Sequence, residues 1–189
     1  MAGKAGGKGR AKSPAREIIK AADDIRRGRF TFKKFVLLTI TLLTAFGGYQ
    51  YAPGRVISVA DGDTVTVYTR ERERKKIRLY GIDAPESKQA WGMESKDFVN
   101  GLVFLQEVEV SVINTDRYGR EVALVKLADG RILNEELVKN GHAWVYRTYC
   151  KEAYCSNWIV MELAARAQKE GLWSQKNPTA PWNWRKRHD

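Results

Sequence analysis

The chain has 189 residues, which is room for one domain of ordinary size with tails, and 43% of them are hydrophobic, enough for a core. The formal charge of +11 suggests an anionic partner, but residues 1–34 hold 11 Lys and Arg against 3 Asp and Glu, a net of +8. Residues 35–189 hold 22 Lys and Arg against 19 Asp and Glu. Because this part of the chain is nearly neutral, its total charge is no argument for nucleic-acid binding. Any such binding must come from locally placed arginines.

Two segments precede the predicted globular body. Residues 1–34 are rich in Gly, Ala and Lys and have too little apolar surface to fold, so we expect a disordered basic tail. Residues 35–48 are an uncharged apolar run of 14 residues directly after Lys33 and Lys34. That length is typical of the apolar region of a signal peptide, about 7–15 residues, and shorter than a spanning helix of about 17–25.

The long basic segment before this apolar run favours an uncleaved anchor instead, so both interpretations of residues 35–51 stay open: a signal peptide or a membrane-anchor helix. A buried core helix is a weaker third interpretation, because the run shows no amphipathic period. Under the first two, the basic tail stays inside and the body is exported. We then expect a cell-envelope, periplasmic or extracellular location.

A globular body is predicted over residues 53–176. Its strands are predicted at 54–60, 64–69, 75–81, 107–114 and 118–127, and its helices at 92–105, 134–141 and 156–170. Asn134 and Ser156 are the expected N-caps of the second and third helices. This order predicts an α+β, mainly β fold: a five-stranded OB-fold Greek-key barrel with three helices, preceded by an N-terminal hydrophobic segment.

Residues 61–86 bring acidic side chains to the ends of two neighbouring predicted strands. Asp61 and Asp63 lie at the turn of the first hairpin, and Asp83 and Glu86 follow the third strand. Like charges so close together repel, and a bound cation with Arg78 nearby would remove that cost. Taken alone, Asp-Gly-Asp-Thr is an ordinary hairpin turn, and Arg78 an ordinary surface ion-pair partner.

Several short motifs occur in a fixed order between residues 54 and 174. They are Asp61-Gly62-Asp63-Thr64, Ile77-Arg78-Leu79, Gly81-Ile82-Asp83-Ala84-Pro85-Glu86, Glu94-Ser95-Lys96, Asp116-Arg117-Tyr118-Gly119-Arg120, Asp129-Gly130, Asn134-Glu135 and Gly171-Leu172-Trp173-Ser174. The ordered set resembles the staphylococcal nuclease-like (thermonuclease) family. The resemblance implies an OB-barrel with three helices and calcium-dependent hydrolysis of DNA and RNA phosphodiester bonds.

The resemblance also implies a metal site. Asp63 and Asp83 would be Ca²⁺ ligands, the carbonyl of Ala84 a third ligand, and Asp61 an outer carboxylate. Calcium prefers oxygen ligands of this kind. Because Ala84 precedes a proline, its backbone is pushed to an extended conformation that would turn this carbonyl outward.

The catalytic roles follow from the same resemblance. Arg78 and Arg120 would hold the scissile phosphate, and Glu86 would be the general base for the attacking water. This suits the chemistry, because guanidinium groups stabilise the charge that builds on phosphate oxygens and a carboxylate can deprotonate water. The expected substrate-binding residues are Arg117, Tyr118 and Tyr149, with Arg147 standing near the position of a second family tyrosine.

The cysteines and histidines limit which other kinds of site the chain can form. Cys150 and Cys155 have neither redox C-x-x-C nor zinc-ligand spacing, so we expect a disulfide if the body is exported and two free thiols if it is cytosolic. His142 and His188 are the only histidines, and His188 lies in a charged tail. A histidine acid–base pair would need both of them, which leaves a carboxylate–arginine site.

The C-terminal segment 177–189 is a Trp-rich basic tail. Trp182 and Trp184 are expected to pack back on the barrel, with stacking on nucleic-acid bases as the alternative. The basic end, which contains Arg185, is expected to be solvated.

Three functions remain in view. The first is a monomeric hydrolase acting on DNA and RNA, and the second is a catalytically silent OB-fold module that binds single-stranded nucleic acid at the cell envelope. The third is an envelope-anchored interaction protein whose basic tail contacts anionic lipid or DNA. A silent module would be expected to lack a key residue, whereas the chain keeps the predicted ligands, base and arginines, and this favours the enzyme.

Overall fold

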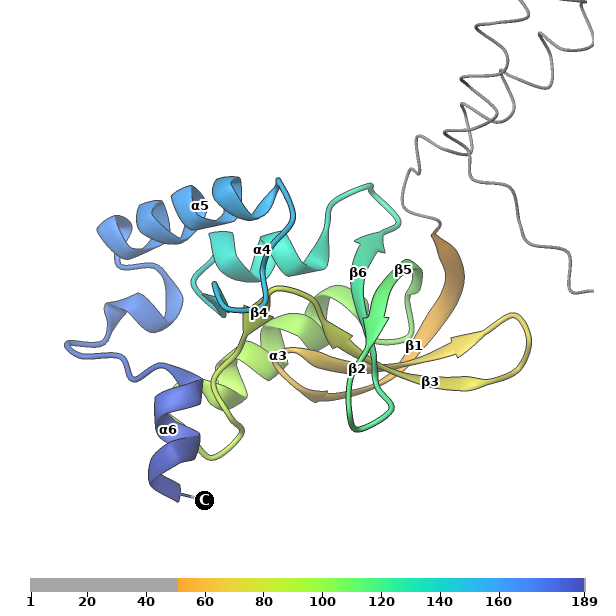
Figure 1. Cartoon of the computed structure of the whole chain (residues 1–189), viewed down its shortest axis with the longest axis horizontal. Coiled ribbons are helices and arrows are strands. Elements are labelled where there is room, and N and C mark those ends of the chain that lie inside the picture. The colour runs from red at the N-terminus through yellow and green to blue at the C-terminus, as the bar shows by residue number, and fades with distance from the viewer. Residues whose placement is uncertain (1–50, 189) are drawn as a thin grey trace, which may run out of the picture. The chain divides into compact units, whose positions relative to one another are not determined.

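The computed structural model describes residues 51–188, and in these residues five strands close into a barrel (Figure 1). The order around the barrel is β1-β2-β3-β6-β5, and β5 pairs with β1 to close it. Strands β3 and β6 run parallel, and the other neighbours run antiparallel. The strands are β1 (Ala52–Asp61), β2 (Thr64–Thr69), β3 (Arg74–Leu79), β5 (Glu107–Thr115) and β6 (Glu121–Leu127). The predicted α+β class and five-stranded barrel are confirmed.

The barrel core follows from the two-residue period of its strands. On β2, Val65 and Val67 are at most 1% exposed, and their partners on β3 include Ile77, which pairs with Val65. On β3, the side chain of Arg78 points away from that of Ile77, because successive residues of a strand face opposite sides. The apolar face therefore fills the barrel, while Arg78 is left at its rim.

Helices and a small second sheet complete the fold. These elements are β4 (Ile82–Asp83), α3 (Gly92–Val103), α4 (Leu133–Lys139), β7 (Trp144–Val145), α5 (Cys155–Gln168), the 3-10 helix η1 (Gly171–Ser174) and α6 (Pro181–His188). Strands β4 and β7 pair antiparallel and place Asp83 opposite Trp144. Helix α6 is the last element of the chain and was not predicted from the sequence (Figure 1).

Both predicted helix caps are wrong. Helix α4 has Ile132 at its N-cap, and Asn134 lies inside the helix with no exposed surface. Its Nδ2 donates to the carbonyls of Tyr80 (3.0 Å) and Ala123 (3.2 Å), and its Oδ1 accepts from the Val125 amide (3.1 Å). The side chain satisfies barrel backbone groups instead of helix amides, so it fastens α4 to the barrel.

Helix α5 likewise starts before the predicted cap. Its N-cap is Tyr154, and Ser156 lies in the first turn, where its hydroxyl donates to the Ala153 carbonyl at 2.8 Å. The predicted strand 118–127 also starts later, at Glu121, because residues 116–120 form a turn held by Asp116.

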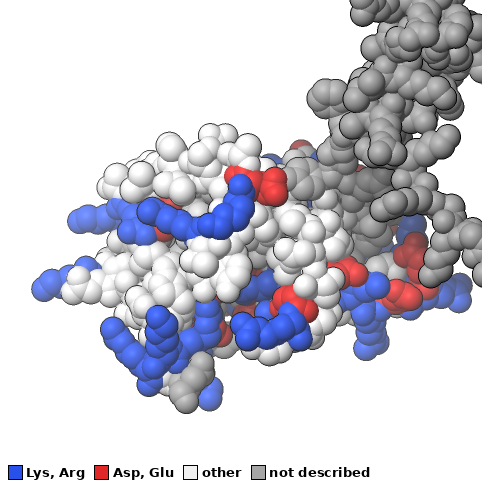
Figure 2. All heavy atoms as spheres, in the orientation of Figure 1, with Lys and Arg blue, Asp and Glu red and all other residues white. Residues whose placement is uncertain are grey.

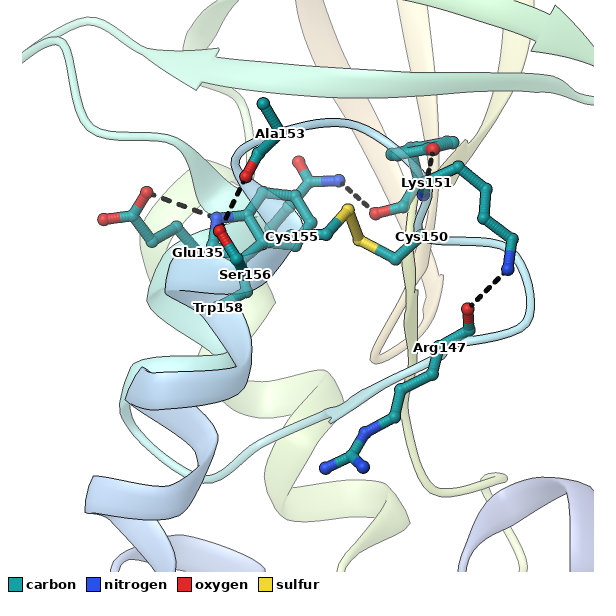
Figure 3. The surroundings of a disulfide bond; sticks show 10 residues. Glu135, Arg147, Cys150, Lys151, Ala153, Cys155, Ser156 and Trp158 are labelled. Atoms are coloured by element: carbon teal, nitrogen blue, oxygen red, sulfur yellow. Dashed lines mark hydrogen bonds between the residues drawn. A yellow bond between two sulfur atoms is a disulfide. The ribbon is translucent and has the colours of Figure 1, made fainter.

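A disulfide joins Cys150 to Cys155 (Figure 3). It links the loop after β7 to the first residue of α5, with 5.7 Å between the two Cα atoms. The amide of Lys151 in the same loop donates to the Tyr80 hydroxyl at 2.9 Å. The bridge therefore fixes the loop that carries Tyr146 and Tyr149 against α5 and the barrel.

The predicted basic tail 1–34 and the larger part of the apolar segment 35–51 lie outside the described residues. Within residues 51–188, no helix has the length and apolar character needed to cross a membrane.

Candidate active site

A cleft of about 610 Å³ lies where the ends of β1, β3 and β4 meet the turn before β6 and helix α6. Most of the predicted site residues line it. They are Asp61, Asp63, Arg78, Ala84, Glu86, Arg117, Tyr118, Arg120 and Tyr149. The remaining one, Asp83, has no exposed surface but contacts two arginines of the cleft. Segments up to 88 residues apart in sequence, from Asp61 to Tyr149, are thus brought to one end of the barrel.

Two buried carboxylates form the floor of this cleft. Asp63 and Asp83 are 2% and 0% exposed, and Arg78 pairs with both, at 2.6 Å from the Asp83 carboxylate. The other oxygen of Asp63 accepts from the Ala84 amide at 2.8 Å. The strand register explains why Asp63 contacts Arg78, because Thr64, the residue after Asp63, pairs with Arg78 across β2 and β3. Buried carboxylates need such positive partners, since an unpaired buried charge costs several kcal/mol.

The turn between β1 and β2 requires a glycine. A Cβ atom on Gly62 would lie 2.7 Å from the Cβ of Ala84 and 2.9 Å from that of Ser95, closer than carbon atoms pack. Asp61 closes the turn, because its carboxylate accepts from the Asp63 amide at 3.0 Å. The Asp-Gly-Asp turn thus places the Asp63 carboxylate against the Ala84 backbone amide.

The turn at residues 116–120 forms another wall. The Asp116 carboxylate accepts from the Tyr118 amide (2.9 Å), the Arg120 amide (3.0 Å) and the Arg120 Nε (2.7 Å). Burial alone would raise the pKa of Asp116, but these hydrogen bonds lower it below its usual range. Asp116 therefore stays ionised and fixes Arg120. The guanidinium carbons of Arg117 and Arg120 both lie 5.6 Å from the centre of the Tyr118 ring, which is 74% exposed.

Arg185 also lines the cleft, although no sequence motif indicated it. Its Nη1 lies 2.5 Å from the Glu86 carboxylate, and its Nη2 lies 2.7 Å from Asp83. Burial lowers the pKa of Arg185, but the hydrogen bonds to Asp83 and Glu86 raise it more, so the group is always charged. The expectation of a solvated basic end is wrong at this residue. The signal that was available is Pro181, a residue favoured at the first position of a helix.

The aromatic wall of the cleft comes from the loop after β7. Tyr146, which the sequence analysis did not single out, lines the cleft and contacts Tyr149 edge-on at 4.7 Å between ring centres. Arg147 points away, because its guanidinium lies 3.8 Å from the buried carboxylate of Glu162 on α5. Tyr149 therefore stands at the cleft in place of Arg147.

Neither histidine lines the cleft. His142 follows α4 and stacks on Phe98, with 4.0 Å between ring centres, and burial lowers its pKa to about 4. His188 stacks on Trp184 at 4.1 Å in α6. The two histidines lie in separate contacts, and the charged side chains that line the cleft are carboxylates and arginines.

The oxygen donors of the cleft suit a hard cation in chemical type. Asp63 and Asp83 both contact the guanidinium group of Arg78, so their two carboxylates lie close together. Among residues 51–188, however, no three His, Cys, Asp or Glu side chains are grouped closely enough to hold a metal on their own. A cation here would need backbone carbonyls or water as further ligands, which calcium accepts readily.

Comparison with known proteins identifies a family. The family described as "Staphylococcal nuclease homologue" matches residues 76–175, more than half of the chain. The chain belongs to the staphylococcal nuclease family. The matched residues of this staphylococcal nuclease-family chain include Arg78, Asp83, Glu86 and Arg120, whereas Arg185 lies beyond them.

Relatives of this family member cover most of its length. An Escherichia coli O157:H7 protein described as an uncharacterized endonuclease is 43% identical over 134 residues, which are 71% of this chain and 85% of the relative. A Shigella flexneri protein named micrococcal nuclease is 35% identical over 159 residues, 80% of this chain and 90% of the relative. A Haemophilus influenzae protein described as an uncharacterized endonuclease is 36% identical over 151 residues, 80% and 82% of the two chains.

Proposed function

We propose that this chain is a calcium-dependent endonuclease that hydrolyses phosphodiester bonds of DNA and RNA in the cleft at the end of its barrel. The observation that carries the proposal is the meeting of Asp63, Asp83, Arg78, Glu86 and Arg120 around one cleft. The enzyme class itself follows from family membership: the chain is a phosphodiester-hydrolysing nuclease.

Asp63, Asp83 and the carbonyl of Ala84 are the proposed calcium ligands, with Asp61 as an outer carboxylate. When bound, the cation would supply positive charge that stabilises the phosphate oxygens. The burial of Asp63 and Asp83 supports this assignment, because both carboxylates already require positive partners. The Asp61 carboxylate accepts a hydrogen bond from the Asp63 amide, which supports its proposed role next to Asp63.

Glu86 is the proposed general base. Its side chain is 34% exposed, so water can reach it, unlike the fully buried Asp83. A carboxylate in this position can take the proton of the attacking water and leave a hydroxide-like nucleophile.

Arg78 and Arg120 are the proposed phosphate-binding groups. They line the cleft from neighbouring segments, β3 and the turn before β6, so a phosphate bound there would meet two planar forks of donors. These forks would stabilise the charge that grows on the phosphate oxygens in the transition state. The proposed substrate-binding residues beside them are Arg117, Tyr118 and Tyr149.

The test is hydrolysis by the purified full-length protein. Fluorescent single-stranded DNA and RNA oligonucleotides are incubated with calcium or with a calcium chelator, alongside the Glu86→Gln variant. We expect cleavage of both substrates with calcium and none with the chelator. If the oligonucleotides bind but are never cut, the silent binding module becomes the better description.

We also propose that residues 51–188 function as a monomer outside the cytoplasmic membrane. Lys33 and Lys34 before the apolar run 35–48 favour this orientation, and the Cys150–Cys155 disulfide is typical of oxidising compartments. An alkaline phosphatase reporter at the C-terminus should be active in intact cells. A reporter that works only in the cytosol would contradict the proposed location.

A further inference from the structure

We propose that Arg185 is a further residue of this active site, where it competes with the cation for Asp83 and thereby sets the calcium affinity of the enzyme. The inference rests on the proposed calcium site. It adds a residue from the C-terminal helix, beyond the part of the chain that matches the family.

The contacts of Arg185 lie on the groups that the cation needs. Nη2 donates to one oxygen of Asp83 at 2.7 Å, and Nη1 donates to the other at 3.2 Å and to Glu86 at 2.5 Å. A guanidinium that is bidentate on a carboxylate uses the lone pairs through which that carboxylate would bind a metal. Calcium and Arg185 therefore exclude each other, at least in part, at Asp83.

Helix α6 is docked in a way that aims this arginine. The Gln89 side chain donates to the Thr179 carbonyl at 2.6 Å, and Pro181 is buried at the start of the helix. Trp182 stacks on Tyr146 with 5.1 Å between ring centres and an interplanar angle of 11°. These contacts hold the helix in place beside the cleft, so Arg185 reaches Asp83 from a fixed position.

The neighbouring basic residues behave differently. Lys and Arg side chains gather over α6 (Figure 2), where Lys186 and Arg187 are exposed, while the Arg185 side chain is 33% exposed and turned into the cleft. Net charge on the helix is therefore not the feature that matters. Arg187 has the same charge two residues away and provides a matched control.

One guanidinium also links the metal ligand to the proposed base. Arg185 binds Asp83 and Glu86 together, so a cation that displaces it from Asp83 also removes a partner from Glu86. The Glu86 carboxylate then regains lone pairs for the proton of water. Binding of the cation and availability of the base are coupled through this one side chain.

Population arithmetic gives the size of the effect. A site whose competent state is only fractionally populated binds its ligand more weakly by that fraction. If Arg185 occupies Asp83 about 90% of the time, calcium binds about tenfold more weakly than to a chain without this arginine. Arginine stays protonated at any physiological pH, so the competition is with the cation and not with protons.

The experiment is calorimetric titration of calcium into the full-length protein without nucleic acid. We compare the parent with Arg185→Ala and Arg187→Ala, after thermal unfolding in chelator has shown that each is folded. Arg185→Ala should bind calcium about tenfold more tightly, and Arg187→Ala should match the parent. Equal or weaker binding by Arg185→Ala overturns the proposal.

A second variant tests the same idea through the helix. Trp182→Ala removes the stacking on Tyr146 that docks α6 but leaves Arg185 in place. It should also tighten calcium binding, by less than Arg185→Ala, and an affinity equal to the parent's would contradict a docked competitor. The proposed nuclease function can fail separately. If the variants bind calcium with these differences but cut no nucleic acid, the inference about Arg185 still holds. If no variant binds calcium, the inference about Arg185 is overturned.

Discussion

The guanidinium of Arg185 lies 2.7 Å from the carboxylate of Asp83, although 102 residues separate them in the chain. Asp83 stands at the end of β4 and Arg185 comes from the last helix, so this contact of the candidate site joins α6 to the end of the barrel. Because the same arginine contacts Glu86, variants of the proposed base also change an ion pair.

Replacing Glu86 by Gln should lower turnover by about 10²–10⁴, the usual contribution of a general base, because the amide keeps the shape but loses the basicity. Binding of a nucleotide analogue in the presence of calcium should survive. Single-turnover hydrolysis measures the first effect and calorimetry the second. Asp83→Asn is the contrasting variant and should weaken calcium binding as well as turnover.

The control for Glu86→Gln is made in a chain that already carries Arg185→Ala. There the loss of the Arg185–Glu86 ion pair no longer contributes, so the same reduction in turnover must appear. Cleavage by either Gln variant at the rate of its own parent would show that the base is another group.

Replacing Arg120 by Lys should damage the transition state more than substrate binding. Lysine keeps the charge but loses the planar fork, and it cannot reproduce the Nε hydrogen bond to Asp116 at 2.7 Å. We expect kcat to fall by about 10²–10³ with a smaller change in KM, as for loss of one donor to a developing oxyanion. Arg131→Lys is the control, because its ion pairs with Asp129 and Glu136 are exposed and none of the three residues lines the cleft. Equal losses in both variants would argue against a specific role.

Replacing Asn134 by Ala should destabilise the fold by about 2–4 kcal/mol, because the Val125 amide and the carbonyls of Tyr80 and Ala123 lose a buried partner. Urea unfolding measures the loss. Asn140→Ala is the matched control: it removes one partly buried hydrogen bond at the end of α4 and should cost about 1 kcal/mol or less. A loss at Asn134 no larger than this would mean that the barrel contacts contribute little.

Stability should fall as the pH drops from 6.5 to 4 because of His142. Burial lowers its pKa from 6.5 to about 4, although Glu94 acts in the opposite direction. In that window the unfolded chain binds a proton that the folded chain does not, so the free energy of unfolding rises with pH. The stabilising contribution of neutral His142 is fully present above pH 6.5. The contribution is at most about 3 kcal/mol.

Urea unfolding at pH 7 and pH 4.5 measures this dependence. His142→Phe keeps an aromatic ring on Phe98 and should show a smaller difference between the two pH values than the parent. His188→Phe, at an exposed position, should behave like the parent. A parent and a His142→Phe variant with the same pH dependence would rule out this histidine as its source.

Local sequence patterns were enough to predict the barrel and most of the residues that line the cleft. Alternating apolar residues such as Val65 and Val67 specify strands with one buried face, and the Asp-Gly pair at residues 61–62 specifies the turn between them. The motifs at residues 61–64, 77–79, 81–86 and 116–120 carried the identities of the site residues. These signals are local, or tied to ordered motifs, and so they can be read from the chain.

Contacts between segments that are distant in the chain could not be predicted in this way and became visible only in the folded structure. Asn134 was expected to cap a helix, but the barrel edge beside α4 offers it three backbone partners that no local pattern announces. Arg185 was expected in water, because a basic run at a chain end is usually solvated. The docking of Trp182 on Tyr146 brings it instead to two buried or partly buried carboxylates, whose need for positive charge outweighs the loss of hydration.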